Sequence, residues 1–264
     1  MGRMNDDEAV RQQYANDDHL ARRIQFHTRY STNQQGMVPW LFSIYRFAPG
    51  DRILELGCGN GGQWEGRLGQ LPDGCQLTLS DFSAGMVEIV RQKYATFPVV
   101  SFTQIDIQAI PCLDETFDVV IANHMLYHVP DLPGALVEVS RVLKPGGHFY
   151  AATNGDGGMR AFLHGAMKHL DPSSGAFGEP QPFSLQNGQS LLEPCFGQVQ
   201  RLEYEDSLCV TDTRDLMDWL ESTISITAFP QDALTGLYEQ FEGIRVREGA
   251  IRIPKEVGLF LCVK

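Results

Sequence analysis

The sequence of 264 residues lacks any hydrophobic run long enough to cross a membrane. A transmembrane helix needs ~20 consecutive apolar residues, and no stretch of the chain approaches that length. The first residues, 1–18, are polar and acidic and contain no apolar segment of the kind found in secretory signals. We therefore expect a soluble, cytoplasmic protein that has no membrane partner.

Basic residues are scarce. Lys and Arg number 21 against 33 Asp and Glu, which gives a net charge of −12. Nucleic-acid-binding proteins need a basic surface to neutralise phosphates, so the composition argues against an RNA or DNA partner. The densest basic stretch, residues 245–255, is interrupted by Glu248, and we interpret it as the solvated face of a helix.

Closely spaced cysteines are missing as well. The six cysteines are far apart and form no C-x-x-C, so neither a zinc knuckle nor a redox pair is indicated. We expect buried thiols and no metal site. Repeats and low-complexity blocks are also absent, and 43 % apolar residues suffice for the core of one large α/β domain.

Strand-like apolar runs alternate with helical patterns between residues 52 and 153. The predicted strands are residues 53–56, 76–81, 99–105, 117–122 and 148–153. The predicted helices between them are residues 63–70, a helix that opens at Ser83, and residues 132–143, followed by a turn at 144–147. This alternation requires a parallel, doubly wound sheet that binds its ligand at the carboxyl ends of the strands.

The flanking segments are predicted to be mainly helical. Before the sheet we expect helices at residues 6–24 and 40–45, separated by a polar stretch at 27–33. After the sheet we expect helices at residues 159–169, 184–193, 213–222 and 232–242. Strands are predicted at residues 198–204, 207–210 and 257–263.

A glycine turn directly follows the first predicted strand, in the run from Glu55 to Gly62 that reads ELGCGNGG. Glycine is needed there because the turn requires positive φ and has no room for a Cβ atom. The run fits both the G-x-G-x-x-G pattern of dinucleotide binders and the E-x-G-x-G-x-G pattern of enzymes that bind S-adenosylmethionine. Glu55 favours the second class, because a carboxylate repels a pyrophosphate but attracts sulfonium and ammonium groups.

Polar side chains end the next three predicted strands of the sheet. Asp81 ends the second strand, Asp106 follows the third and Asn123 follows the fourth. Because the carboxyl ends of parallel strands meet at one edge of the sheet, we expect these residues to converge with the glycine turn.

In this order and spacing, these motifs resemble those of class I S-adenosylmethionine-dependent methyltransferases. The resemblance rests on Glu55–Gly61, Asp81–Ser83 with Met86, Asp106–Ile107, Asn123–Val129 and Leu143–Gly147. It implies an α/β fold with a doubly wound, Rossmann-like, seven-stranded and mostly parallel sheet whose last strand is antiparallel. It further implies a helical N-terminal cap at residues 1–48 and a methyltransferase core at 49–264, with a lid or substrate insert around 154–182 and 211–250.

The resemblance also implies which residues bind the cofactor S-adenosylmethionine. They are Glu55, Gly57, Cys58, Gly59, Asn60, Asp81, Phe82, Met86, Asp106, Ile107, Asn123 and His124. Asp81 is expected to accept hydrogen bonds from the ribose hydroxyls and Asp106 from the adenine amino group. Phe82 and Met86 are expected to form apolar walls around the adenine.

Three residues are candidates for a catalytic role: His124, His128 and Tyr30. Either histidine could take the proton of a hydroxyl or acid acceptor, although methyl transfer from a sulfonium needs no dedicated base. The predicted function is transfer of a methyl group from S-adenosylmethionine to a small-molecule acceptor, by a monomer or a homodimer.

Three alternatives stay open at this point. The protein could be an NAD(P)-dependent oxidoreductase that uses Gly57, Gly59 and Gly62. It could be an enzyme that uses S-adenosylmethionine for non-methyl chemistry, such as intramolecular cyclisation. It could also be a regulatory protein that binds the cofactor without chemistry.

Overall fold

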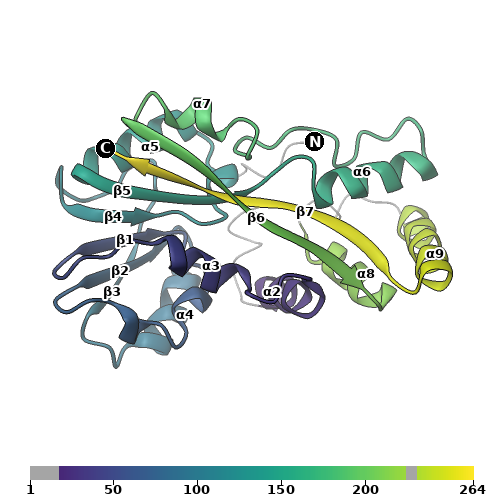
Figure 1. Cartoon of the computed structure of the whole chain (residues 1–264), viewed down its shortest axis with the longest axis horizontal. Coiled ribbons are helices and arrows are strands. Elements are labelled where there is room, and N and C mark those ends of the chain that lie inside the picture. Colours follow the sequence, from purple (N-terminus) through teal and green to yellow (C-terminus); the bar gives the residue numbers. More distant parts are fainter. Residues whose placement is uncertain (1–17, 224–230) are drawn as a thin grey trace.

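A seven-stranded sheet lies at the centre of the protein, in a computed structural model that describes residues 18–223 and 231–264 (Figure 1). Its strand order is β3-β2-β1-β4-β5-β7-β6. The strands are β1 Arg52–Leu56, β2 Gln76–Asp81, β3 Val100–Gln104, β4 Phe117–Ile121, β5 Leu143–Asn154, β6 Gln198–Val210 and β7 Ile251–Val263. The first five are parallel, and β7 runs antiparallel to both β5 and β6. The predicted doubly wound, Rossmann-like sheet with an antiparallel last strand is confirmed.

Each face of the sheet is covered by its own hydrophobic cluster. Successive residues alternate between the faces, so that Leu54 and Val120 belong to one cluster while Ile53 and Val119 belong to the other. The helices α5 (Leu132–Val142) and α7 (Gly188–Leu192) cover the first face. The second face is covered by α3 (Met37–Ile44) and α4 (Ala84–Tyr94).

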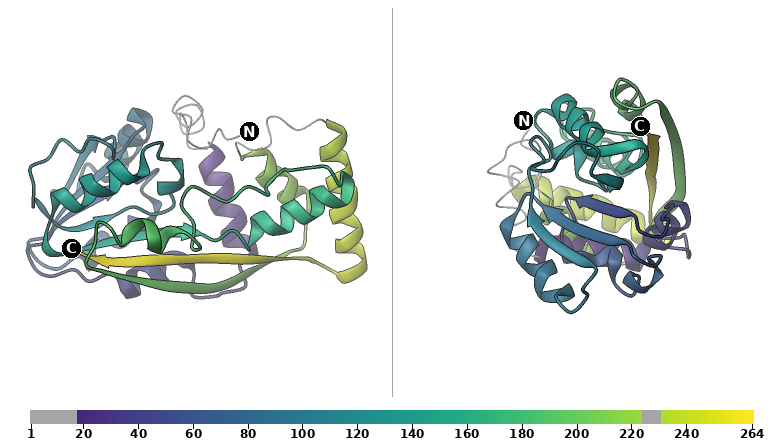
Figure 2. Two further views of the ribbon diagram at one scale, coloured as in Figure 1. Left: turned by 90° about the horizontal axis from the view of Figure 1, so that it is seen from above. Right: turned by 90° about the vertical axis from the view of Figure 1, so that its left-hand side faces the viewer.

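A third hydrophobic cluster lies beyond the parallel strands. The long strands β6 and β7 continue past the rest of the sheet and meet four helices, which we call the helical group (Figures 1 and 2). The helical group consists of α2 (Asp18–Tyr30), α6 (Met159–Leu170), α8 (Thr213–Glu221) and α9 (Gln231–Glu248). Because the parallel strands point toward it, the helical group faces their carboxyl ends across the space where ligands bind in such sheets.

Several helices differ from the sequence-based expectation. The helix predicted at 63–70 is replaced by two single 3₁₀ turns, η2 (Gly62–Trp64) and η3 (Leu68–Gln70). Gly66 lies between them with φ +68°, a left-handed conformation that interrupts a right-handed helix. The helix predicted at 184–193 is the shorter α7. The first helix continues to Tyr30, and residues 6–17 of that prediction lie outside the described residues.

The C-terminal strands are longer than expected. The two strands predicted at 198–204 and 207–210 form the single strand β6. The last strand begins at Ile251, six positions before the predicted start, because its first residues pair with the far end of β6. The interpretation of 245–255 as one solvated helix face was therefore wrong. Its final residue, Lys255, lies in β7 with a side chain that is only 10 % exposed.

The turn predicted at 144–147 is part of β5. The pairing of β5 with β4 shifts between Phe117 and Val119, which accommodates the extra residues as an irregularity of the strand. Gly146, within this irregularity, has a left-handed backbone conformation with φ +77°, and the chain nevertheless stays in the strand.

Candidate active site

One large cavity lies between the carboxyl ends of the parallel strands and the helical group. Its volume is about 1430 Å³. A pocket for one small ligand usually measures about 300–1,000 Å³, so this cavity has room for a cofactor and a second molecule. Its walls come from the loops after β1, β2, β3 and β4 on one side and from α2, α6, α8 and β7 on the other.

The glycine turn presents bare backbone to this cavity. Gly57, Gly59 and Gly61 have φ values of +70°, +54° and +69°. A Cβ atom added to Gly57 would lie 2.8 Å from the side chain of Met125, and one added to Gly61 would lie 2.8 Å from Tyr94. Both the left-handed backbone and the close packing therefore require glycine at these positions.

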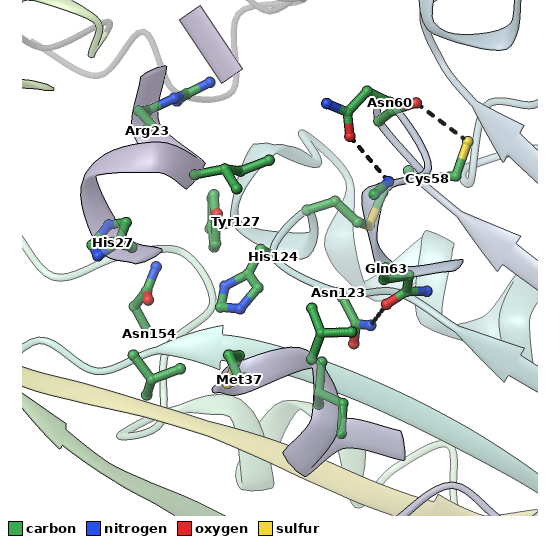
Figure 3. Close-up of a pocket in the computed structure, with 18 of the residues that line it drawn as sticks. Arg23, His27, Met37, Cys58, Asn60, Gln63, Asn123, His124, Tyr127 and Asn154 are labelled. Carbon is green, nitrogen blue, oxygen red and sulfur yellow. Dashed lines mark hydrogen bonds between the residues drawn. The ribbon is translucent and has the colours of Figure 1, made fainter. Parts of the chain in front are cut away.

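Cys58 and Asn60, which are predicted cofactor residues, hold the shape of this turn. The Cys58 thiol donates to the carbonyl of Gly59 at 3.6 Å, and burial raises its pKa well above the ordinary value. The side-chain oxygen of Asn60 accepts from the amide of Gly62 at 3.1 Å (Figure 3). Both residues also line the cavity.

Asp81 joins the glycine turn to the start of α4. One carboxylate oxygen accepts from the amide of Gly59 at 2.9 Å, and the other accepts from the amide of Ser83 at 2.9 Å. Burial raises the pKa of Asp81, although these two hydrogen bonds oppose the rise. Each carboxylate oxygen has a second lone pair, so Asp81 can still accept from two ligand hydroxyls.

Glu55 is buried at the base of the turn, with 3 % of its surface exposed. Its two oxygens accept from the side chains of Gln63 at 2.6 Å and Trp64 at 2.5 Å. Burial and the nearby charge of Asp81 raise the pKa of Glu55 to about 7, while the two hydrogen bonds act against this rise. Glu55 is thus held by internal donors, and its charge at neutral pH depends on what occupies the cavity.

A chain of side-chain hydrogen bonds connects Glu55 to the loop after β4. The Gln63 side-chain oxygen accepts from the Asn123 amide at 2.9 Å (Figure 3). The same amide donates to the Tyr45 hydroxyl at 2.7 Å. Neither Gln63, Trp64 nor Tyr45 was predicted from the sequence. Gln63 and Trp64 directly follow the glycine turn, and this position could have indicated that they lie close to Glu55. The prediction of a helix at 63–70 directed attention away from that possibility.

Asp106 and Ile107 line the cavity at the end of β3, as expected. The carboxylate of Asp106 accepts from the backbone amide of Gln108 at 2.9 Å and from its side chain at 3.1 Å. Phe82 lines the cavity beside them. Met86 does not lie among the described lining residues and is fully buried at 0 % exposure, so its predicted role as an adenine wall is not supported.

A family model described as a methyltransferase domain matches residues 54–151, which run from the first strand into the fifth. The matched segment contains the glycine turn and the polar ends of all four strands that border the cavity. The chain carries a class I methyltransferase domain.

Two curated relatives are similar to part of the chain. Demethylmenaquinone methyltransferase of Symbiobacterium thermophilum is 36 % identical over 107 residues, 39 % of this chain and 42 % of the relative. Malonyl-[acyl-carrier protein] O-methyltransferase of Serratia marcescens is 30 % identical over 126 residues, 47 % of this chain and 46 % of the relative. The matches thus span less than half the length of each relative.

A solved structure resembles the chain over a greater length. The putative methyltransferase from an antibiotic biosynthesis pathway of Anabaena variabilis aligns with a TM-score of 0.62. The alignment covers 86 % of this chain and 96 % of that one, at 15 % sequence identity. At this identity the likeness concerns the fold alone.

The three catalytic candidates occupy different places in the structure, and only His124 and His128 fall within residues 54–151. His124 and His128 line the cavity, whereas Tyr30 does not lie among the described lining residues. The Tyr30 hydroxyl donates to Asp215 of α8 at 2.5 Å, and burial together with this bond raises its pKa to about 12. The prediction of Tyr30 as a catalytic residue is therefore not supported by its placement.

His124 adopts a left-handed conformation with φ +55°, and its amide donates to the carbonyl of Ala152 at 2.8 Å. Burial, reinforced by the positive charge of Lys255, lowers the pKa of His124 to about 4. With a pKa of about 4, His124 is neutral at physiological pH.

His128 ends the 3₁₀ turn η4 (Leu126–His128), where its ring packs edge-to-face on Tyr127 with centroids 4.6 Å apart.

The N-terminal segment is anchored to the long strands beside the cavity. The carboxylate of Asp206 accepts from the hydroxyl of Ser31 at 2.5 Å and from the amides of Thr32 and Asn33 at 3.1 and 3.0 Å. It also pairs with Lys255. Burial opposes the ionisation of Asp206, but the bonds from Lys255 and Ser31 outweigh it and lower the pKa. This anchor holds the end of α2, whose residues line the cavity, against β6.

The described residues contain neither a metal cluster nor a membrane-crossing helix. No group of three or more His, Cys, Asp or Glu is arranged to hold a metal ion within residues 18–223 and 231–264. In the same part of the chain, no helix combines the length and the apolar character needed to span a bilayer.

Proposed function

We propose that the protein transfers a methyl group from S-adenosylmethionine to a small-molecule acceptor. The observation that carries this proposal is the meeting of Glu55, Asp81 and Asp106 with a bare glycine turn around one cavity. These residues come from the ends of three different strands, and only the doubly wound sheet brings them together.

The chemistry of the cavity fits a cationic nucleoside better than a nicotinamide dinucleotide. Glu55 directly precedes the turn and Asp81 accepts from the amide of Gly59, whereas a dinucleotide would place its anionic pyrophosphate against the turn. The sheet also departs from the dinucleotide-binding order 3-2-1-4-5-6, because the antiparallel β7 is inserted between β5 and β6. Both features weigh against the oxidoreductase alternative.

The roles of the residues follow from their positions in the cavity wall. The backbone of Gly57 and Gly59 would border the methionine portion, while Asp81 would accept from the ribose hydroxyls. Asp106 and the Ile107 amide would bind the adenine edge. When bound, the cofactor supplies a methyl group activated by a positive sulfur. The chain itself contributes orientation and exclusion of water, which can supply most of the rate for such a displacement.

The size of the cavity and the names of the relatives support a small acceptor. About 1430 Å³ exceeds what one cofactor needs, and the remaining walls come from α2, α6 and α8. Two relatives are named for a demethylmenaquinone and for a malonyl-acyl-carrier-protein substrate. We propose that residues 1–48 act as the N-terminal cap and that 154–182 and 211–250 hold the acceptor, in a cytoplasmic monomer or homodimer without a nucleic-acid partner.

Calorimetry with three ligands tests the cofactor. S-adenosylmethionine and S-adenosylhomocysteine are expected to bind with Kd values on the order of micromolar, and NADPH is expected not to bind. Binding of NADPH alone would overturn the proposal. Incubation with methyl-labelled cofactor and a small-molecule extract then tests the reaction. S-adenosylhomocysteine is the expected by-product, whereas methylthioadenosine would reveal attack by the cofactor's own amine.

A further inference from the structure

The amide side chains of Gln63 and Asn123 form a hydrogen-bonded chain that ends on the carboxylate of Glu55. Gln63 belongs to the 3₁₀ turn η2 after the glycines, and Asn123 follows β4. Gln63 donates from Nε2 to one oxygen of Glu55 at 2.6 Å and accepts at Oε1 from Nδ2 of Asn123 at 2.9 Å. Figure 3 shows the Gln63 and Asn123 side chains end to end in the cavity wall. Gln63 thus links Asn123 to Glu55.

The direction of every bond in this chain is set by a backbone amide of β5. An N–H group can only donate, and the amide of Ala152 donates to Oδ1 of Asn123 at 3.3 Å. The side-chain nitrogen of Asn123 then points the other way, toward Oε1 of Gln63 and toward the Tyr45 hydroxyl, to which it donates at 2.7 Å. Gln63 must therefore present its nitrogen, and not its oxygen, to Glu55.

This direction matters because the two ends of an amide act oppositely on a carboxylate. An N–H group stabilises the ionised form, whereas a carbonyl oxygen in the same place destabilises it. Glu55 is only 3 % exposed, so its charged form in the ligand-free protein depends on internal donors. Its other oxygen accepts from Nε1 of Trp64 at 2.5 Å, and an indole nitrogen can only donate. Of the two donors, only Gln63 could turn the wrong way.

The titratable neighbours of Glu55 do not replace this control. Burial raises the pKa values of Cys58, Tyr45 and Tyr94, so these three groups stay neutral below about pH 9. Burial also raises the pKa of Glu55, the two donated hydrogen bonds oppose the rise, and the charge of Asp81 adds to it. Loss of either hydrogen bond should therefore make Glu55 harder to ionise.

We propose that Gln63 and Asn123 are positioning residues that keep the carboxylate of Glu55 ready to meet the positively charged cofactor. Gln63 acts by donating to Glu55 directly, and Asn123 acts by preventing rotation of the Gln63 amide. The inference rests on the proposed function for the identity of the cation. The effect on Glu55 itself is a property of the ligand-free chain and is measured without any cofactor.

The indole N–H of Trp64 provides that measurement, because it donates to the Glu55 carboxylate. Its NMR resonance is followed between about pH 5 and about pH 9 in ¹⁵N-labelled, ligand-free protein. The chain has three tryptophans, and Trp40→Phe and Trp219→Phe assign the other two indole resonances. The midpoint of the wild type is expected at about pH 7, the value to which burial raises the pKa of Glu55.

Two substitutions that preserve side-chain size are expected to raise this midpoint. Gln63→Met removes the donor to Glu55 and should raise the midpoint by about one pH unit. Asn123→Leu frees the Gln63 amide to rotate and should raise the midpoint by at least about half a unit. An unchanged midpoint in either variant would overturn the assignment of that residue.

Tyr150→Phe is the matched control. Its hydroxyl accepts from the amide of Arg46 at 2.9 Å, and its ring packs on Tyr45 with centroids 4.9 Å apart, so the substitution removes a neighbouring hydrogen bond outside the chain. It should lower the melting temperature but move the midpoint by less than about 0.2 units. A shift as large as that of Asn123→Leu would show that general loosening, and not the direction of the amides, controls Glu55.

Calorimetry with S-adenosylmethionine then connects the chain of amides to the cofactor. The loss of affinity in Gln63→Met should be about sevenfold greater at pH 6 than at pH 8.5, because a higher midpoint depletes the ionised form mainly at the lower pH. Equal losses at both pH values would contradict the inference. Failure of S-adenosylmethionine to bind the wild type would instead refute the proposed function, and the NMR titration separates the two cases.

Discussion

Raising the pH from 6 to 8 is expected to strengthen S-adenosylmethionine binding by about tenfold, because Glu55 loses its proton over this range. The pKa of Glu55 is raised to about 7 by burial and by the charge of Asp81. Such a carboxyl is ionised in roughly one molecule in eleven at pH 6 and in roughly ten in eleven at pH 8. A cationic ligand binds the ionised form better, so the ratio of these fractions sets the expected gain.

The effect on the unliganded protein has the opposite sign. The folded protein holds the Glu55 proton up to about pH 7, whereas the unfolded chain releases it near the ordinary value of 4.5. The stabilising contribution of Glu55 is therefore fully present below pH 4.5 and is lost as the pH rises through 7. Binding of the cation at pH 6.5 should release this proton, which calorimetry in buffers of different ionisation enthalpy measures directly.

Glu55→Gln is the matched perturbation, because it keeps the shape of the side chain and removes the charge. The amino group of the cofactor titrates near pH 8 and affects binding to both proteins equally. In the variant, this group should be the only cause of a change in S-adenosylmethionine affinity with pH. Binding of S-adenosylhomocysteine, which lacks the sulfonium, should show a shallower slope in the wild type. An identical pH slope in wild type and variant, with no proton release at pH 6.5, would refute the reasoning.

Three further outcomes are expected. Gly57→Ala should lower the melting temperature more than Gly66→Ala and should abolish cofactor binding in calorimetry. Both positions have positive φ, but only at Gly57 would the new Cβ lie 2.8 Å from a side chain. Equal effects of the two substitutions would contradict this reasoning. Asp81→Ala should weaken S-adenosylhomocysteine binding at least about tenfold and destabilise the fold by about 1–3 kcal/mol, since two backbone amides lose their acceptor, whereas the exposed Asp73→Ala should do neither. His124 has a pKa lowered to about 4, so its stabilising contribution is present above pH 6.5 and is lost as the pH falls toward 4. His124→Asn, which tolerates the left-handed backbone, should therefore lose less thermal stability than the wild type between pH 7 and pH 5; a parallel loss would show that His124 does not titrate as a buried neutral group.

The parallel, doubly wound arrangement of the first five strands and the convergence of their polar ends on one edge of the sheet could be predicted from the sequence. Short apolar runs, glycines after the first strand and polar residues after the next strands are local signals, and parallel strands bring their carboxyl ends together. For this reason the lining positions of Gly57, Asp81 and Asp106 agree with the expectation. The resemblance to class I methyltransferases added the antiparallel last strand, which local patterns alone did not supply.

The hydrogen-bonded surroundings of Glu55 could not be predicted in the same way. The sequence indicated a carboxylate available to a cationic ligand, but Gln63 and Trp64, both in the 3₁₀ turn η2, donate hydrogen bonds to its two oxygens. The break in the helix depends on the left-handed Gly66, and the raised pKa depends on burial. Neither burial nor a turn of this kind leaves a periodic signal in the chain.

The sequence by itself determined a doubly wound sheet with a glycine turn and carboxylates at one edge, because these features depend on neighbouring residues and on the geometry of parallel strands. Only the tertiary structure decided what faces that edge. His27 and Trp219 come from helices at opposite ends of the chain, and they meet because β6 and β7 extend beyond the sheet and because Asp206 anchors the segment after α2. Such contacts depend on the packing of distant elements, so this side of the cavity forms only in the folded chain.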